Sequence, residues 1–179
     1  MHFPSKYKCL NQNEFEAGDY KIVPIRYEDR MEIMKWRNEQ IYHLRQNKIL
    51  SEADQENYFG SVIKNLFRKN KPSQLLFSFI KENVCVGYGG LVHINWIDKH
   101  AEISFIMNTD LETKSFQIYW TKFLNIIERV AFDKLYFHKI FTYAFDVRPN
   151  LYDILEKSDF NLEARLKEHC KFSNKFIDV

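Results

Sequence analysis

One carboxylate stands inside an apolar stretch of the chain. Glu102 lies in the run from 100 to 107, most of which is apolar and strand-forming. A carboxyl group in an apolar wall holds its proton more tightly than one in water, which suits a general base. The alternative is a plain polar sheet face that Glu102 shares with His100 and Ser104, since alternate strand residues point the same way. We therefore treat Glu102 as the candidate base.

A polar segment follows this run and leads into a helix. Residues 108–114 predict a loop, and the apolar residues after it recur at helical spacing: Phe116, Trp120, Phe123, Leu124, Ile127 and Ala131. The first turn of a helix has unpaired N–H groups, which are suited to binding phosphate. Lys114 adds a cation there. The alternative is an ordinary helix cap, with Thr113 or Ser115 as the N-cap residue.

The surrounding pattern predicts the elements that position these residues. A hairpin turn at 95–99 separates two runs rich in Val, Ile, Phe and Tyr, so the strands on either side are expected to be antiparallel. Further strands are predicted at 19–25, 74–81, 139–146, 160–169 and 175–179, and further helices at 27–38, 51–68 and 148–157. The fold class is a mixed α/β domain with a largely antiparallel central sheet and about four helices.

Length and composition indicate one globular domain over residues 1–179, in which 1–18 form an irregular surface segment. Aromatic residues make up 16% of the chain, which argues against disorder. The net charge of +2 indicates no preference for nucleic acid or membrane. Three widely separated cysteines supply neither a disulfide framework nor a metal site. Without a signal-peptide pattern near the first residues, we expect a cytoplasmic protein.

The order of hairpin, polar loop and amphipathic helix resembles the core of the GNAT acetyltransferase fold. Trp36-Arg37-Asn38 is similar to a motif of amino-sugar N-acetyltransferases that act on nucleotide-linked sugars in surface-polysaccharide synthesis. The run 100–104 resembles a segment of the ribosomal-protein N-acetyltransferase branch. Two segments near the end, 155–160 and 163–166, are similar to the Leu-Glu-Lys-Leu-Gly-Phe and Glu-Gly-x-Leu segments of the family.

The resemblance implies that acetyl-CoA is the cofactor. Its binding residues would lie at the end of the second hairpin strand, in the polar segment and at the start of a later helix: Phe105, Ile106, Met107, Glu112, Thr113, Lys114, Ser115, Phe116, Gln117 and Asn150. Family members carry two glycines in the stretch that corresponds to 112–117, and both are replaced here, while a carboxylate, Glu112, occupies the first position of that stretch. Glycine there allows the backbone to approach phosphate closely.

The resemblance also places a small-molecule amine, such as a nucleotide-linked sugar, beside the first helix. Its candidate contacts are Trp36, Arg37, Asn38, Tyr42, Arg45 and Tyr88. A guanidinium binds phosphate in two places, so Arg37 or Arg45 would suit a nucleotide diphosphate. The alternative roles are core filling for Trp36, a surface ion pair for Arg37 and a helix cap for Asn38.

Acetyl transfer also needs a group that protonates the leaving thiolate. Many GNAT members use a Tyr, and the matching position here is Leu155. Tyr152 lies three residues earlier on the same helix face and is the candidate substitute. The alternative for Tyr152 is an ordinary packing role with its hydroxyl toward solvent.

Three hypotheses follow for the function. The first is an N-acetyltransferase for an amino sugar, as a monomer or homodimer. The second is an acetyltransferase for a protein N-terminus or a lysine. The third is a GNAT-shaped binding module without coenzyme A, which the missing glycines favour.

Overall fold

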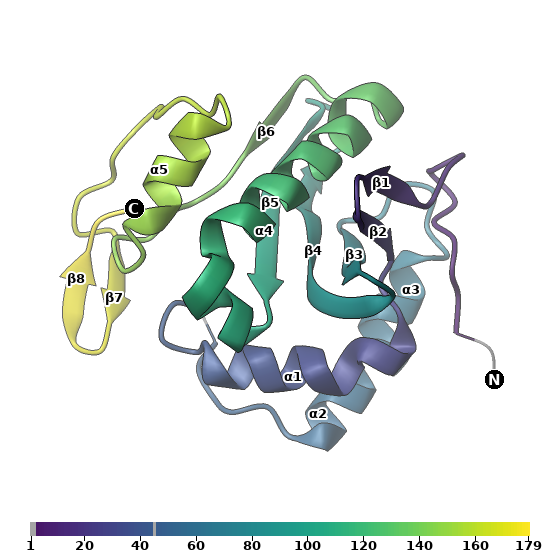
Figure 1. The fold of residues 1–179 in the computed structure, drawn as a ribbon, viewed down its shortest axis with the longest axis horizontal. Helices are drawn as coiled ribbons and strands as arrows, with labels where there is room; N and C mark the ends of the chain where they lie inside the picture. The colour runs from purple at the N-terminus through teal and green to yellow at the C-terminus, as the bar shows by residue number, and fades with distance from the viewer. Residues whose placement is uncertain (1–2, 45) are drawn as a thin grey trace.

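The computed structural model describes residues 3–44 and 46–179. Its main sheet has six strands in sequence order, of which only the last pair is parallel (Figure 1). The strands are β1 Phe15–Ala17, β2 Tyr20–Pro24, β3 Leu75–Lys81, β4 Val84–Asn95, β5 His100–Met107 and β6 Lys139–Phe141. The predicted hairpin is formed by β4 and β5, and the largely antiparallel sheet is confirmed.

Four helical stretches flank the sheet, as predicted. They are α1 Arg30–Glu39 with the preceding turn η1 Tyr27–Asp29; α2 Glu52–Asn57, η2 Tyr58–Ile63 and α3 Lys64–Leu66 as one run; α4 Thr109–Arg129 with η3 Val130–Lys134; and α5 Asn150–Lys157. The second run begins with a capping box, in which Ser51 and Asp54 bond each other's backbone N–H groups.

The sheet is covered on both faces. On one face lies α4 (Figure 1), where the Phe105 ring of β5 stacks on Phe123 of α4 with centroids 4.1 Å apart. On the other face, Asp29 accepts a hydrogen bond from Ser78 of β3, and Arg37 of α1 donates one to Tyr88 of β4. Side chains alternate along a strand, so Glu102 shares the second face with Tyr88, according to the register of β4 and β5.

The prediction that residues 1–18 are an irregular surface segment was wrong in two respects. Residues 15–17 form β1, which pairs with β2. Tyr7 is only 1% exposed, and its hydroxyl donates to the carbonyl of Leu76 at 2.8 Å and accepts from the N–H of Leu76 at 3.0 Å. The Tyr7 ring also stacks on Phe67. Short segments that pack by single aromatic residues carry no periodic pattern, so the sequence did not predict them.

The predicted loop over residues 108–114 is helical. Asn108 is the N-cap residue of α4, and its side chain accepts from the N–H groups of Asp110 and Leu111. The capping roles proposed for Thr113 and Ser115 were therefore wrong. The helix is kinked at Ser115, where φ is −144° and ψ is 26°. Polar composition indicated a loop, but a cap at Asn108, five residues before Thr113, allowed the helix to start sooner.

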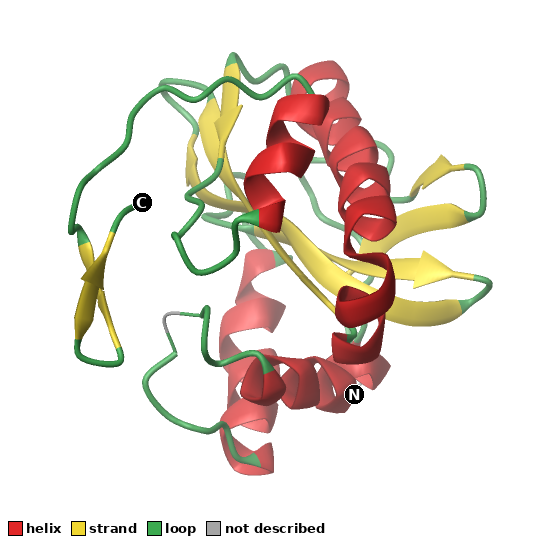
Figure 2. Cartoon of the chain, turned by 60° about the vertical axis from the view of Figure 1, so that its left-hand side comes forward, coloured by secondary structure: helices red, strands yellow, loops and turns green. Residues whose placement is uncertain are grey.

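Strand predictions near the C-terminus were too long. β6 ends at Phe141, and residues 142–149 continue without strand pairing. The segment predicted at 160–169 contains no strand, and β7 Cys170–Phe172 follows it, whereas the segment predicted at 175–179 gives β8 Lys175–Ile177. These two strands pair with each other and form a hairpin that stands apart from the main sheet (Figure 2). Apolar and aromatic residues in this region pack singly against neighbours, as Phe172 does against Phe145.

Replacing Tyr7 by Phe tests the buried anchor of the N-terminal segment. The variant keeps the ring but leaves the N–H of Leu76 without its partner, while the carbonyl of Leu76 still accepts from the N–H of Ile25. The free energy of unfolding should therefore fall by about 1 to 3 kcal/mol. Urea denaturation gives this difference. Tyr136→Phe is the control, because Tyr136 is 78% exposed and should change little. Equal stability of the two variants would contradict the anchoring role.

Candidate active site

A cavity of about 120 Å³ lies between β5, α4 and the chain that runs from β6 to α5. Its lining comes from these three parts of the chain, from the connection between α1 and α2, and from α5: His43, Leu44, Glu102, Ile103, Ser104, Phe105, Ile106, Trp120, Thr142, Tyr143, Phe145, Val147, Arg148 and Leu151. Of the predicted site residues, Glu102, Phe105 and Ile106 meet here.

The cavity exists because β5 and β6 run together for only three residue pairs. Their pairing ends at Glu102 and Phe141. Beyond that point the Thr142 hydroxyl donates to the carbonyl of Ile103 at 3.3 Å, while Gln40 donates to the carbonyl of Met107 at 2.7 Å. These two carbonyls point away from β4, and by strand alternation so do the backbone groups of Phe105. An edge of β5 thus faces the cavity.

Glu102 stands where the two strands part. Its side chain is 18% exposed and lines the cavity. One carboxylate oxygen lies 2.6 Å from Nδ1 of His93 on β4. The predicted alternation with His100 and Ser104 is also observed, because all three side chains are partly exposed between buried neighbours. A polar strand face and a carboxylate at the cavity are therefore both present.

A nearly buried ion pair lies at the cavity, whose lining includes one of its two members, Arg148. Arg148 donates to Glu112 Oε1 at 2.7 Å, and the two side chains are only 13% and 11% exposed. The guanidinium also lies 4.8 Å from the centre of the Phe116 ring. Burial raises the pKa of Glu112, and Arg148 opposes that shift. The charge of the Glu112 carboxylate is thus neutralised by Arg148 of the same chain.

His43 completes this cluster as a buried, neutral ring. Its Nδ1 lies 3.3 Å from Arg148 Nη1, and its Nε2 lies 3.2 Å from Gln40 Oε1. The geometry fits a ring that donates from Nε2 and accepts at Nδ1. Burial and then the charge of Arg148 lower the pKa of His43 to about 3. Gln40 in turn donates to Thr109 at the first residue of α4, so one network joins α1 to both walls of the cavity.

Met107, the last residue of β5, is 1% exposed and does not line the cavity. The other cofactor candidates lie on the first turns of α4 and at the start of α5. Thr113, Lys114 and Gln117 are exposed, while Ser115 lies at the kink. A residue with non-helical dihedral angles interrupts the regular hydrogen bonding of a helix, so backbone N–H groups near Ser115 are candidates for binding phosphate. Asn150 is exposed at the first residue of α5 and does not line the cavity.

The acceptor candidates divide into packing residues and accessible ones. Trp36 is 1% exposed and belongs to the core, as its alternative role predicts. Asn38 uses both polar atoms on residues of the following loop, bonding the N–H and C=O of Leu50, and is not the cap of α1. Tyr42 is 57% exposed. Arg45 lies outside the described residues.

Arg37 behaves differently from the surface ion pair that was its alternative. Its guanidinium donates to the Tyr88 hydroxyl at 2.8 Å and to Gln46 at 3.1 Å, both neutral partners. No carboxylate pairs with it in the part of the chain that the structure describes. A partly buried guanidinium is thus held in place without a counter-ion.

Comparison with known proteins decides the family. Residues 22–179 match the family described as acetyltransferase (GNAT) domain. The chain belongs to the GNAT acetyltransferases. Membership confirms the predicted class of enzyme, an N-acetyltransferase that uses acetyl-CoA.

Solved structures show the same fold at low identity. A spermidine N-acetyltransferase from Vibrio cholerae, in complex with CoA and spermine, is 18% identical with a TM-score of 0.75, over 90% of this chain and 92% of that one. A GNAT-family acetyltransferase from Bacillus anthracis is 17% identical with a TM-score of 0.72, over 92% and 93%. Neither the amino-sugar branch nor the ribosomal-protein branch is distinguished by these likenesses.

In this GNAT chain, Tyr152 does not line the cavity. The Tyr152 hydroxyl lies 3.4 Å from the carbonyl of Ala144 and from Asp146, and burial, followed by Asp146, raises its pKa. Tyr143, which sequence reasoning did not single out, lines the cavity instead. The roles of Trp120 and Arg148 were also missed. Arg148 gave one signal, since it directly precedes Pro149 at the predicted start of a helix.

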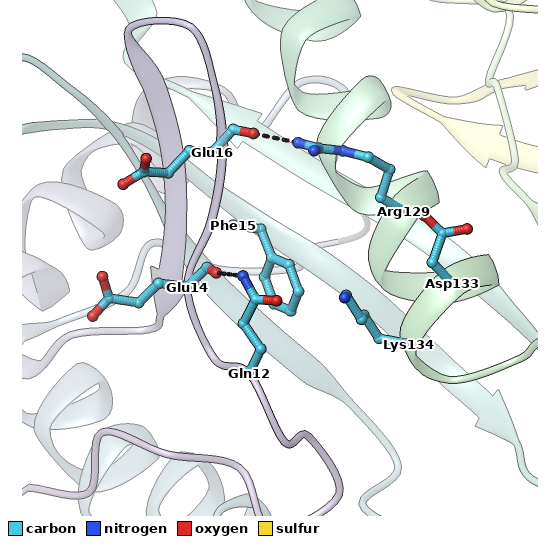
Figure 3. Close-up of a pocket in the computed structure, with 7 residues that line it drawn as sticks. All are labelled: Gln12, Glu14, Phe15, Glu16, Arg129, Asp133 and Lys134. Carbon is cyan, nitrogen blue, oxygen red and sulfur yellow. Dashed lines mark hydrogen bonds between the residues drawn. The ribbon is translucent and has the colours of Figure 1, made fainter.

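A larger hollow, of about 450 Å³, lies between the N-terminal segment and the end of α4 (Figure 3). Arg129 donates to the backbone carbonyl of Glu16 there, while the side chains of Glu14 and Glu16 point away from the helix. Its contacts join two elements and converge on no reactive group. Among residues 3–44 and 46–179, no cluster of metal-ligating side chains is found, and no helix is long and apolar enough to cross a membrane.

The buried neutral His43 predicts a pH dependence of stability in this acetyltransferase. The unfolded chain takes up a proton at His43 below pH 6.5, whereas the folded protein does so only near pH 3. Stability from this group is therefore present above pH 6.5 and is lost as the pH falls, at about 1.4 kcal/mol per pH unit. Glu112, with its raised pKa, acts in the opposite direction.

His43→Gln isolates this effect, because an amide can donate to Gln40 without titrating. Between pH 7.5 and pH 5, the wild type should lose about 2 kcal/mol relative to the variant. Urea denaturation at a series of pH values provides the comparison. Parallel stability curves for the two proteins would mean that His43 is not held neutral.

Proposed function

We propose that the protein transfers the acetyl group of acetyl-CoA to the primary amine of a small molecule that also carries an anionic group, such as a nucleotide-linked amino sugar. Glu102 is the general base in this proposal, and Arg37 binds the anion. The observation that carries the proposal is the guanidinium of Arg37, held by two neutral partners and without a carboxylate partner among the described residues.

A partly buried cation without a counter-ion favours an anionic ligand. Burial removes part of the hydration of a charge, and an opposite charge from a ligand restores that lost stabilisation. The hydrogen bonds to Tyr88 and Gln46 fix the plane of the guanidinium, and the same side of the sheet carries Glu102. An acceptor spanning the two would present its phosphate to Arg37 and its amine toward Glu102.

A polyamine is the alternative acceptor, because the Vibrio cholerae structure was solved with spermine. A polyamine carries only positive charges at neutral pH, so an unpaired Arg37 would repel it. At 18% identity the acceptor of that protein does not transfer to this chain. The charge at Arg37 therefore favours an anionic acceptor.

Residues of β5 and of the first turns of α4 suit the binding of coenzyme A. The edge of β5 at Phe105 offers backbone groups for the amides of the pantetheine arm, and Lys114 offers a cation near the kink in α4. Glu112 does not repel the pyrophosphate, since Arg148 neutralises it. Bound acetyl-CoA supplies the thioester acetyl group and a thiol leaving group.

Glu102 contributes the proton transfer. The acceptor amine is largely an ammonium ion at neutral pH and must lose a proton before its nitrogen can attack. The carboxylate at the cavity is positioned to take that proton, directly or through a water molecule. Neither Tyr152 nor Asn150 lines the cavity, so the proposal assigns them no step.

UDP-glucosamine and glucosamine test the anion, because they share the amine and differ in the nucleotide diphosphate. Arg37→Ala should raise the KM for UDP-glucosamine by about 10-fold or more, since a hydrogen bond to a charged group contributes roughly 1.5 to 3 kcal/mol. The KM for glucosamine should barely change. Steady-state acetyl transfer with each acceptor measures both. Arg68→Ala, at an exposed residue after α3, is the control.

Two results would contradict this proposal. Equal losses with both sugars would give Arg37 a purely structural role. Wild-type activity on spermidine that exceeds activity on UDP-glucosamine would point to a polyamine acceptor instead.

Glu102→Gln tests the base. The variant keeps the shape of the side chain, so folding and coenzyme binding should persist while kcat falls by roughly 100-fold or more. The loss should shrink as the pH is raised, because more of the amine is then already neutral. Single-turnover rates with UDP-glucosamine provide the measurement, and Glu14→Gln, at an exposed residue, is the control. A silent Glu102→Gln in an active preparation would remove Glu102 as the base.

A further inference from the structure

His93 lies at an irregular point of β4, one residue after Val92, which is the strand partner of Glu102. Val92 is paired with Glu102 and Asn95 with His100, so two residues of β4 oppose one residue of β5. This count defines a β-bulge, a feature that redirects a side chain and is frequent beside active sites. In a regular strand, His93 would point to the face opposite Glu102.

The backbone of His93 is strained to make this contact. Its φ is +48°, in the left-handed region that non-glycine residues seldom occupy. Such a conformation costs energy and persists only where surrounding interactions maintain it. The interaction that maintains it here is the 2.6 Å hydrogen bond between His93 Nδ1 and a carboxylate oxygen of Glu102.

The two side chains connect the cavity to solvent. The Glu102 side chain is 18% exposed and lines the cavity, whereas the His93 side chain is 74% exposed. An imidazole can take up a proton at one nitrogen and release one from the other. A path of two titratable groups thus runs from the cavity to the bulk water.

We propose that His93 is the positioning residue of Glu102 and the outlet for the proton that Glu102 receives. This inference rests on the proposed function of Glu102 as the base. It adds how the base is returned to its ionised form between turnovers, and why β4 carries a bulge at this residue.

While Glu102 is ionised, the Nδ1–H group of His93 donates to the carboxylate. The acceptor nitrogen gives one proton to the Glu102 carboxylate as it forms its bond to the acetyl carbon and the bond from that carbon to sulfur breaks. Exchange with solvent then moves the ring proton of His93 from Nδ1 to Nε2, so that Nδ1 can accept the proton of the Glu102 carboxylic acid. The imidazolium ion formed in this way releases its Nε2 proton to water, which restores the starting tautomer and the ionised Glu102. The thiolate receives its proton from another donor.

His93→Gly is the sharpest test, because glycine tolerates the positive φ and leaves space for a free imidazole molecule. The kcat with UDP-glucosamine should fall by about 10-fold or more, within the roughly 100-fold that general acid–base groups contribute. Added imidazole should restore much of the lost rate, and the KM for acetyl-CoA should not change. A merely structural role would give no rescue by imidazole.

Two control variants complete the experiment. His169→Gly removes an exposed histidine on the segment before β7 and should keep the wild-type rate with or without imidazole. Glu102→Gln should gain nothing from imidazole, because the first proton acceptor is missing. Wild-type kcat in His93→Gly, or a low kcat that imidazole does not raise, would overturn the outlet while leaving the acetyl transfer intact. An inactive wild type would overturn the proposed acceptor class, and the outlet with it.

Discussion

The parting of β5 from β6 is the constraint on which the candidate active site depends. Two parallel strands that stay paired satisfy each other's backbone groups and leave no room for a ligand. Here the pairing ends after Glu102 and Phe141, and the chain from 142 to 149 turns away toward α5. The separation leaves a cavity with β5 backbone in its wall, and Glu102 lines this cavity at the point where the two strands part.

The separation has to be held open by interactions elsewhere. The ion pair between Arg148 and Glu112 ties the chain before α5 to the first turns of α4. His43 and Gln40 extend that tie to α1 and to the last residue of β5. Buried charges are costly unless they are paired, so loss of either member of the ion pair would leave an uncompensated charge in the wall.

The same ion pair changes the interpretation of the polar segment. A carboxylate at the first position and two missing glycines suggested poor phosphate binding from the sequence. In the structure, the carboxylate is directed to Arg148, and a kink at Ser115 interrupts the helix. Family membership agrees with a chain that handles acetyl-CoA in spite of this composition.

The sequence by itself determined the fold class, the β4–β5 hairpin, the helix that ends at Trp36-Arg37-Asn38 and the position of Glu102 in a strand. Hydrophobic periodicity and turn residues are local properties, so they can be deduced from neighbouring residues. The family resemblance led to the class of enzyme and its cofactor.

Only the tertiary structure decided which polar side chains meet. Arg148 and Glu112 are 36 residues apart, and Arg148 and His43 are 105 apart. The His93 contact depends on a one-residue bulge that reverses the expected face of the strand. Tyr7 anchors a segment without any periodic pattern. Such contacts depend on packing between distant segments and on strand register, which no local pattern in the sequence encodes.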